Sequence, residues 1–158
     1  MCGTPSKVPG LPDGEKLLRL PVRRGPTSVT IVVVAAAVVE RQGRFLVTRR
    51  PTGTHLAGLW EFPGGKCESE ESLESCLARE LREELAVDAV IHEPMLATTH
   101  DYADHRVELH FFRCSISTEP SAALGQEIRW VSGEELWRLE FPPADASLIQ
   151  LLAPPRSS

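Results

Sequence analysis

The sequence predicts a mixed α/β sandwich, a fold in which helices cover a β-sheet. Two observations carry this prediction. A β-branched run from Val29 to Val39 is typical of a buried strand, and one strongly periodic stretch, Ser72 to Leu85, is typical of an amphipathic helix. Further strand-like segments precede and follow this helix. With 158 residues, the chain has the length of a single domain.

The other elements follow from local patterns along the chain. Gln42-Gly43 predicts a turn, after which residues 44–50 return as a second strand and form a hairpin with the first. Three further strands are predicted at 87–97, 106–116 and 127–131, and two short helices at 134–139 and 146–152.

The central helix has recognisable ends and faces. Ser72 is expected to cap its N-terminus, and Glu74 lies in the first turn, where a negative charge is favourable. One side of the helix carries the apolar residues Leu73, Cys76, Leu77, Leu81 and Leu85. We expect this side to face the sheet.

The two ends of the chain differ from its middle. Residues 1–27 are rich in proline and predict a flexible extension, residues 28–153 are expected to form the domain, and residues 154–158 a frayed tail. The first residues lack the basic segment followed by an apolar one that a secretory signal has, so a cytoplasmic protein is expected.

Composition narrows the possible partners. The net charge of −5 at pH 7 argues against a surface that follows nucleic-acid phosphates, so no stable nucleic-acid partner is expected. The longest apolar run, residues 29–39, is shorter than the roughly 20 residues of a membrane helix, so no membrane association is expected. The oligomeric state stays open between monomer and dimer.

The four cysteines, Cys2, Cys67, Cys76 and Cys114, are scattered along the chain. They contain no C-x-x-C pair, and their spacing does not suggest zinc. A chain of this length does not need disulfides. We therefore interpret the cysteines as buried or incidental thiols.

The most informative feature is a concentration of acid in the central helix and the loop before it. From Glu68 to Glu84 there are seven glutamates and two arginines, a charge of −5 that equals the net charge of the whole chain. Three of them, Glu80, Glu83 and Glu84, share one helical face. That face is centred only about 60° from the apolar side, whereas a solvated face would lie opposite to it.

Clustered carboxylates repel one another unless a cation lies between them. Hard oxygen ligands suit Mg²⁺, with Mn²⁺ as a possible substitute, better than zinc. For three glutamates alone, a merely charged amphipathic helix would be the simpler interpretation. The surrounding spacing favours the metal site.

That spacing is Gly65, five residues, Glu71, seven residues, and then Arg79-Glu80-Leu81-x-Glu83-Glu84. It resembles the Nudix box, the signature of the Nudix hydrolases, which cleave nucleoside diphosphates linked to another moiety. The resemblance implies the Nudix fold, of α/β (α+β) class, with a mixed β-sheet sandwiched between helices.

The same resemblance assigns roles to the residues of the box. Glu71 would form a salt bridge with Arg79, and both are counted with the catalytic set. Glu80, Glu83 and Glu84 would hold metal and help to activate water, with the carbonyl of Gly64 as an additional ligand. The chain departs from the family at Ala86, where glycine is expected. We interpret this position as a helix cap, so alanine should cost stability of about 1 kcal/mol without affecting the chemistry.

Beyond the box, the chain is similar to the MutT branch, the oxidised-nucleotide diphosphatases. The matching segments are Thr48-Arg49-Arg50, His55, Leu59 to Lys66 and Phe141 to Asp145. In that branch, positions matching Arg50, Phe62 and Asp145 surround the base. Taken alone, Arg50 could be a solvent charge at a strand end and Phe62 an ordinary core residue.

The remaining candidate site residues lie around these segments. His55, Gly65, Lys66 and Arg106 are expected to bind substrate, and Glu127 is a candidate for a remote metal ligand. Arg106 could equally be a plain strand-start arginine. The segment from His100 to His105 is expected to cover the site.

The predicted function is a Mg²⁺-dependent pyrophosphohydrolase that sanitises nucleotides by hydrolysing 8-oxo-dGTP to 8-oxo-dGMP and pyrophosphate. Its partner would be a small nucleotide. One alternative is a pyrimidine enzyme for CTP or 5-hydroxy-CTP, because Asp145 could serve guanine when ionised or cytosine when protonated. The others are a non-catalytic 8-oxoguanine-binding module, and a Nudix enzyme for ADP-ribose, dinucleoside polyphosphates or a sugar nucleotide.

Overall fold

The computed structural model describes residues 30–51, 53 and 58–155. The predicted extension over residues 1–27 and the candidate site residue His55 lie outside the described residues. The predicted domain limits therefore stay predictions. None of the helices in the described ranges is long and apolar enough to cross a membrane.

The sheet is built around its first strand. β1 (Thr30–Arg41) lies parallel to β6 (His105–Ile116), and β6 pairs antiparallel with β5 (Ala89–Asp101). At its other end β1 turns into β2 (Arg44–Arg49) through Gln42 and Gly43, both of which have positive φ. The predicted hairpin is present, but only two residue pairs join its strands, Glu40 with Phe45 and Arg41 with Arg44.

The main pairing partner of β2 is not β1 but a strand much later in the chain. β2 pairs over its whole length with β7 (Glu127–Ser132), and its last two residues pair with the short strand β3 (Trp60–Glu61). A second short strand, β4 (Gly64–Lys66), pairs antiparallel with the middle of β1. Sequence patterns did not predict β3 or β4, because two or three residues are too few to show a strand period.

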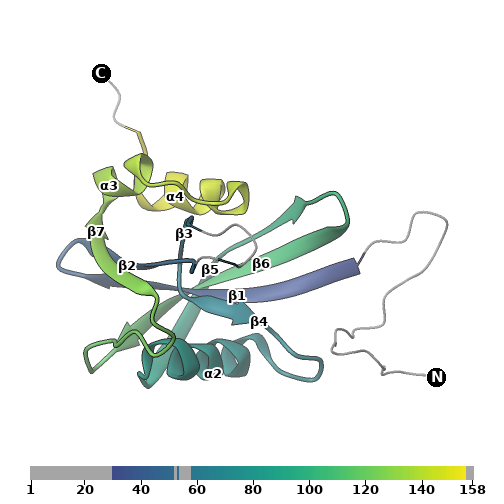
Figure 1. Cartoon of the computed structure of the whole chain (residues 1–158), viewed down its shortest axis with the longest axis horizontal. Helices are drawn as coiled ribbons and strands as arrows, with labels where there is room; N and C mark the ends of the chain where they lie inside the picture. Colours follow the sequence, from purple (N-terminus) through teal and green to yellow (C-terminus); the bar gives the residue numbers. More distant parts are fainter. Residues whose placement is uncertain (1–29, 52, 54–57, 156–158) are drawn as a thin grey trace.

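Helices cover both faces of the sheet (Figure 1), as predicted. α2 (Leu73–Leu85) lies on one face; α3 (Gly133–Arg138), the 3₁₀ turn η2 (Pro143–Asp145) and α4 (Ala146–Leu152) lie on the other. The predicted strand at 87–97 begins two residues later and extends to Asp101, and the other predicted elements agree to within two residues.

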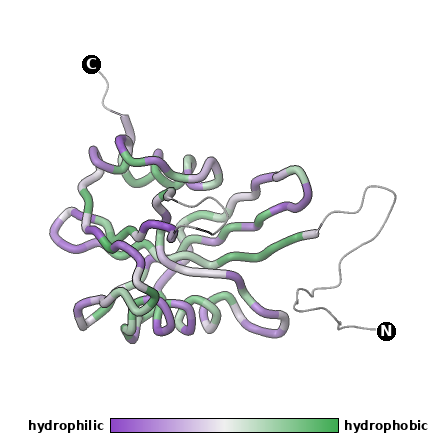
Figure 2. Tube along the Cα trace, viewed as in Figure 1, coloured by the Kyte–Doolittle hydropathy of each residue, from purple (hydrophilic) through white to green (hydrophobic). Residues whose placement is uncertain are grey.

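The core is divided by the sheet into two layers. Along β1, Ala36 and Val38 pack toward α3 and α4, whereas Ala35, Ala37 and Val39 pack toward α2. This is the alternation expected of a strand that is buried on both sides. Figure 2 shows the hydrophobic residues concentrated in the strands and the hydrophilic residues mostly in the turns. The apolar side of α2 is buried through Cys76, Leu77, Leu81 and Leu85, as predicted.

Both ends of α2 are capped. The Ser72 hydroxyl oxygen accepts a hydrogen bond from the Ser75 amide at 3.0 Å. At the other end Ala86 adopts the left-handed conformation, with φ 57° and ψ 39°, and donates its amide to the Arg82 carbonyl. The interpretation of Ala86 as a left-handed cap is therefore confirmed.

The interpretation of the cysteines as thiols is wrong for one pair. Cys67, in the loop after β4, forms a disulfide with Cys76 in the second turn of α2. The two residues are nine apart in sequence, but the loop folds back onto the helix and brings their Cα atoms to 5.2 Å. Cys114 is a buried free thiol, as predicted.

Candidate active site

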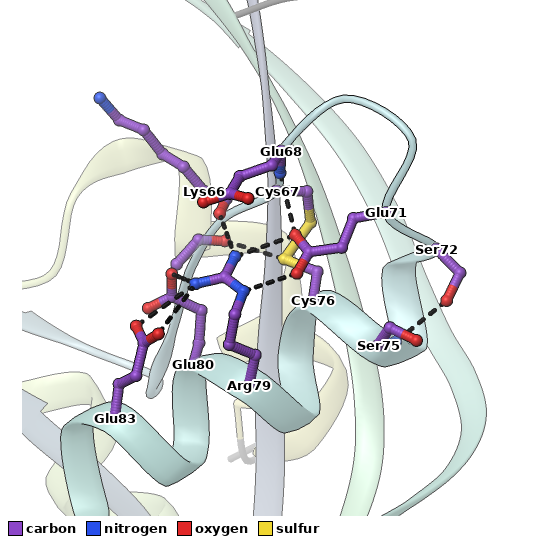
Figure 3. The surroundings of a disulfide bond; sticks show 11 residues. Lys66, Cys67, Glu68, Glu71, Ser72, Ser75, Cys76, Arg79, Glu80 and Glu83 are labelled. Atoms are coloured by element: carbon purple, nitrogen blue, oxygen red, sulfur yellow. Dashed lines mark hydrogen bonds and ion pairs between the residues drawn. A yellow bond between two sulfur atoms is a disulfide. The ribbon is translucent and has the colours of Figure 1, made fainter. Parts of the chain in front are cut away.

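Arg79 is the centre of the ion-pair network on α2 (Figure 3). Its guanidinium donates to both carboxylate oxygens of Glu71, at 2.5 and 2.9 Å. It also donates to Glu80 at 3.1 Å, to Glu83 at 3.3 Å and to the Lys66 carbonyl at 3.2 Å. The ion pair predicted between Glu71 and Arg79 is thus present. One arginine joins the loop before the helix to two of the three predicted metal ligands.

The glycines bring the backbone of β4 against this helix. A side chain on Gly65 would overlap the carboxylate of Glu80, and a side chain on Gly64 would overlap the Ala35 carbonyl of β1. The Gly64 amide points to the carboxylate of Glu84, with N and Oε1 3.4 Å apart. Only glycine permits an approach this close.

Two of the helix carboxylates lie in a poorly hydrated environment. Burial raises the pKa of Glu80, partly offset by Arg79. Burial raises the pKa of Glu84 to about 8, and the neighbouring charge of Glu80 adds to this shift. By contrast, the hydrogen bonds from Arg79 lower the pKa of Glu71. The site therefore holds carboxylates that repel one another beside a pair that is already neutralised.

The donor set shows whether these residues suit a divalent cation. Glu80 and Glu84 are separated by one helical turn, and both lie against the glycine loop. Mutually repelling oxygen donors are what Mg²⁺ or Mn²⁺ would neutralise, so the residues fit such an ion. As placed here, no three acidic, histidine or cysteine side chains of the described residues lie close enough together to hold one metal, and Arg79 pairs with two of the predicted ligands.

Two other candidates, Glu127 and Arg106, have partners of their own. Glu127 on β7 pairs with Arg49 at 3.5 Å and with Arg129 at 3.1 Å, so its carboxylate is engaged within the sheet. Arg106 is exposed and pairs with Asp101 at 2.5 Å, next to the turn of the β5–β6 hairpin. The side chain of Lys66 is exposed beside the glycine loop. The contacts of Glu127 and Arg106 do not join them to the carboxylates of α2.

A second group of predicted residues lies where β2 and β3 end. The guanidinium of Arg50 donates to the carboxylate of Glu61 at 2.5 Å, and both side chains are largely buried. Phe62 is part of the core, where it stacks on Phe141 with ring centres 5.4 Å apart and meets Phe111 edge-on. Arg50 is thus not a free solvent charge, and the described contacts of Phe62 are core contacts.

Asp145 is the most unusual residue of this group. Only 5% of it is exposed, and no hydrogen bond from the described residues reaches its side chain. Burial raises its pKa to about 7, with the charge of Glu61 adding to the shift and that of Arg50 opposing it. A buried carboxyl group without a partner is costly, and such groups are often completed by a ligand.

The hairpin between β5 and β6 reaches the same region. Tyr102 stacks on His105 with ring centres 5.0 Å apart and meets His100 edge-on at 4.7 Å. Burial raises the pKa of Tyr102, and the charge of Asp145 contributes to the shift. The hairpin therefore lies close to Asp145. That residues 100–105 cover the site stays a prediction.

Two residues near the site were missed from the sequence. Glu61 binds Arg50; a charge between the buried Trp60 and Phe62 could have identified it. Gln126 is buried and donates its amide to the Glu84 carbonyl at 2.8 Å, which secures the end of α2. No local pattern marks Gln126, because the contact spans 42 positions.

Comparison with known proteins agrees with this geometry. The model of the NUDIX domain family matches residues 34–151. The chain is 36% identical over 121 residues to a CTP pyrophosphohydrolase from Escherichia coli, an alignment that covers 76% of the chain and 90% of that relative. It is 35% identical over 124 residues to an 8-oxo-dGTP diphosphatase from Haemophilus influenzae, covering 77% and 91% of the two chains.

Solved structures give the same result. The E. coli ORF135 protein superimposes with a TM-score of 0.69 at 35% identity, covering 77% of this chain and 88% of that one. The MutT protein from Methanosarcina mazei shares the fold, with a TM-score of 0.72 at 24% identity and coverage of 78% and 94%. The signature residues, the fold and these relatives agree, and the chain belongs to the Nudix hydrolase family.

Proposed function

We propose that this Nudix hydrolase is a Mg²⁺-dependent nucleoside triphosphate pyrophosphohydrolase that converts 8-oxo-dGTP and water into 8-oxo-dGMP and pyrophosphate. The observation that carries the choice of base is Asp145, a buried carboxyl group whose pKa is raised to about 7 and whose side chain lacks a hydrogen bond from the described residues. The relatives named 8-oxo-dGTP diphosphatase support the choice of reaction.

The neutral form of Asp145 offers one donor and one acceptor side by side. In 8-oxoguanine, oxidation at C8 places a hydrogen on N7, so that a donor lies beside the O6 acceptor. Unmodified guanine presents two acceptors at these positions. A neutral carboxyl group therefore complements the oxidised base and leaves one mismatched contact with the normal one. Arg50, close enough for its charge to act on Asp145, supplies donors for a carbonyl oxygen of the base.

The α2 end of the site supports the cleavage step. When bound beside Glu80 and Glu84, Mg²⁺ supplies positive charge that offsets the phosphates and lowers the pKa of water. Glu80 or Glu83 accepts the proton of the water that attacks phosphorus, and pyrophosphate leaves. Gly64 and Gly65 let the backbone approach the triphosphate, and Lys66 beside them is exposed and available to it. Arg79 and Glu71 hold the loop on the helix.

One further substrate class is favoured by the same observation. Cytosine presents the N3 acceptor beside the N4 amino donor, which also complements a neutral carboxyl group. The relative named CTP pyrophosphohydrolase, 36% identical to this chain, supports this alternative. CTP and 5-hydroxy-CTP are therefore the substrates against which 8-oxo-dGTP must be compared.

A pyrophosphate-release assay with Mg²⁺ tests the proposal. The kcat/KM values of 8-oxo-dGTP, dGTP, CTP, 5-hydroxy-CTP, dATP and ADP-ribose would be compared. We expect 8-oxo-dGTP to exceed dGTP in kcat/KM by at least about tenfold, the effect of one hydrogen bond replaced by a repulsive contact. A preference for CTP or 5-hydroxy-CTP would replace the purine assignment. Tight binding of 8-oxo-dGMP without hydrolysis of any triphosphate would replace the enzyme with a binding module.

A further inference from the structure

Glu61 is a partly buried acidic residue that the proposed mechanism does not use. It is the last residue of β3 and lies opposite Thr48 of β2, one position before Phe62. Its carboxylate accepts a hydrogen bond from Arg50 at 2.5 Å, and about a quarter of each side chain is exposed. A buried charge is costly unless it is paired. The pairing with Arg50 therefore constrains both side chains.

The backbone of Arg50 is fixed as well. Its amide donates to the Leu59 carbonyl at 2.8 Å, and its own carbonyl accepts from the Gly58 amide at 3.0 Å. These backbone hydrogen bonds join the end of β2 to the residues just before β3 and fix the position of the Arg50 Cα atom. They do not set the direction of the long, flexible side chain. The carboxylate of Glu61 does so, because a charge-assisted hydrogen bond selects one orientation of the guanidinium.

The charge of Glu61 also acts on Asp145. It contributes to the raised pKa of Asp145, the residue proposed to read the base, and Arg50 opposes this shift. Both members of the pair are therefore close enough to Asp145 for their charges to act on its carboxyl group.

We propose that Glu61 is a positioning residue that determines base selectivity by holding the guanidinium of Arg50 beside Asp145. This role rests on the proposed function, since it presupposes that the base binds between Arg50 and Asp145. Without the carboxylate, Arg50 keeps its charge but loses the ion pair that aligns its guanidinium with β3. Discrimination between bases should fall, whereas the cleavage step, which takes place at α2, should continue at its normal rate.

The test uses Glu61→Gln, Glu61→Ala, Arg50→Ala and the double variant Glu61→Ala/Arg50→Ala in the full-length chain. The matched control is Glu119→Ala, which removes a glutamate–arginine pair on the surface, with Arg41 at 2.9 Å. For each protein, kcat and KM would be measured for the preferred nucleotide of the wild type and for its unoxidised counterpart. Binding of the corresponding monophosphate would be measured without metal.

Glu61→Ala should raise KM and monophosphate Kd about tenfold and lower the preference ratio to a similar extent, with kcat within about twofold of wild type. Glu61→Gln, which keeps an acceptor for Arg50, should lose about threefold. In the Arg50→Ala background, Glu61→Ala should have no further effect, because two residues that act as one unit are not additive.

Three results would overturn this role: a loss of kcat with unchanged KM, a loss that persists undiminished in the Arg50→Ala background, or weaker binding of all nucleotides with an unchanged preference ratio. Should Glu61→Ala fail to fold, Glu61→Gln provides the same comparison. Failure of the proposed function is distinguishable, because it would appear as absent hydrolysis by the wild-type protein, whereas the monophosphate measurements still report on Glu61.

Discussion

The two ends of the site are built in opposite ways. At the phosphate end, the residues come from one continuous segment, Gly64 to Glu84. The hydrogen bonds and ion pairs of Arg79 join its glutamates. At the base end, Arg50, Glu61 and Asp145 come from three separate segments and are largely buried. The phosphate end can be recognised as a sequence motif, whereas the base end exists only once the chain has folded. Under the proposed function, the cleavage step and the choice of base would therefore depend on separate parts of the fold.

The largest expected effect tests whether cleavage depends on the phosphate end alone. Glu83→Gln with Glu84→Gln should lower kcat with Mg²⁺ by roughly 10³-fold, because both charge and basicity are lost. Binding of 8-oxo-dGMP without metal should stay within about twofold. Pyrophosphate release and calorimetric titration measure the two quantities. Glu74→Gln, an exposed substitution on the same helix, is the control and should retain full activity.

Unchanged turnover of the double variant would contradict a role of the α2 carboxylates in cleavage. A fall of monophosphate binding together with kcat would show that the two ends of the site act as one unit.

The disulfide adds a constraint that only the phosphate end possesses. Reduction of Cys67–Cys76 should lower the free energy of unfolding by about 2–3 kcal/mol, the loop-closure value for a short loop. Urea unfolding with and without a dithiol reductant measures the change. A Cys67→Ala/Cys76→Ala variant should not respond to the reductant. An equal response from that variant would show that the effect does not arise at this disulfide.

At the base end, Asp145→Asn should remove a pH dependence. The pKa of Asp145 is raised to about 7, so its neutral form and its donor are lost as the pH rises through that value. The wild-type KM for 8-oxo-dGTP should therefore rise about tenfold or more between pH 6.5 and 8.5. Asparagine offers a donor and an acceptor at every pH, so the variant should vary much less.

The same group affects stability with a defined sign. The folded protein binds this proton more tightly than the unfolded chain, whose pKa is near 3.8. The contribution of Asp145 to stability is therefore full below about pH 4 and is lost as the pH rises toward 7. Relative to the wild type, Asp145→Asn should become more stable over this interval in thermal unfolding. Parallel pH profiles for the two proteins would contradict the raised pKa.

The smallest effect concerns the end of α2. Ala86 has a left-handed conformation that glycine adopts without strain. Ala86→Gly should raise the free energy of unfolding by about 1 kcal/mol and leave kcat/KM unchanged. Urea unfolding and the pyrophosphate assay measure the two quantities. A change in kcat would mean that the helix end contributes to catalysis beyond its role as a cap.

The contrast between the two ends also explains what the sequence could reveal. The helix, its N-cap and the buried leucines follow from local sequence pattern and were predicted from it. The Glu71–Arg79 pair was predicted from the resemblance to the Nudix box. The strands β3 and β4 were not, because their pairing with β2 and β1 leaves no periodic pattern in so few residues. The Cys67–Cys76 disulfide could not be predicted from the spacing of the cysteines, because it depends on how the loop folds back onto α2.

For the base end, the sequence predicted which residues belong to the site but not which residues they contact. Arg50, Phe62 and Asp145 were predicted from resemblance, yet the partner of Arg50 was missed, and Phe62 lies in the aromatic core. The burial of Asp145, which raises its pKa, arises in η2, a turn that contacts β5 only in the folded chain. Burial of this kind is a property of the folded chain.

The most direct test of the account is the ratio of kcat/KM for 8-oxo-dGTP to that for dGTP with Mg²⁺, with the products identified. We predict pyrophosphate and 8-oxo-dGMP as products and a ratio of at least about ten, which Asp145→Leu should bring close to one. Equal hydrolysis of the two nucleotides by the wild-type protein, or the absence of pyrophosphate among the products, would contradict the account.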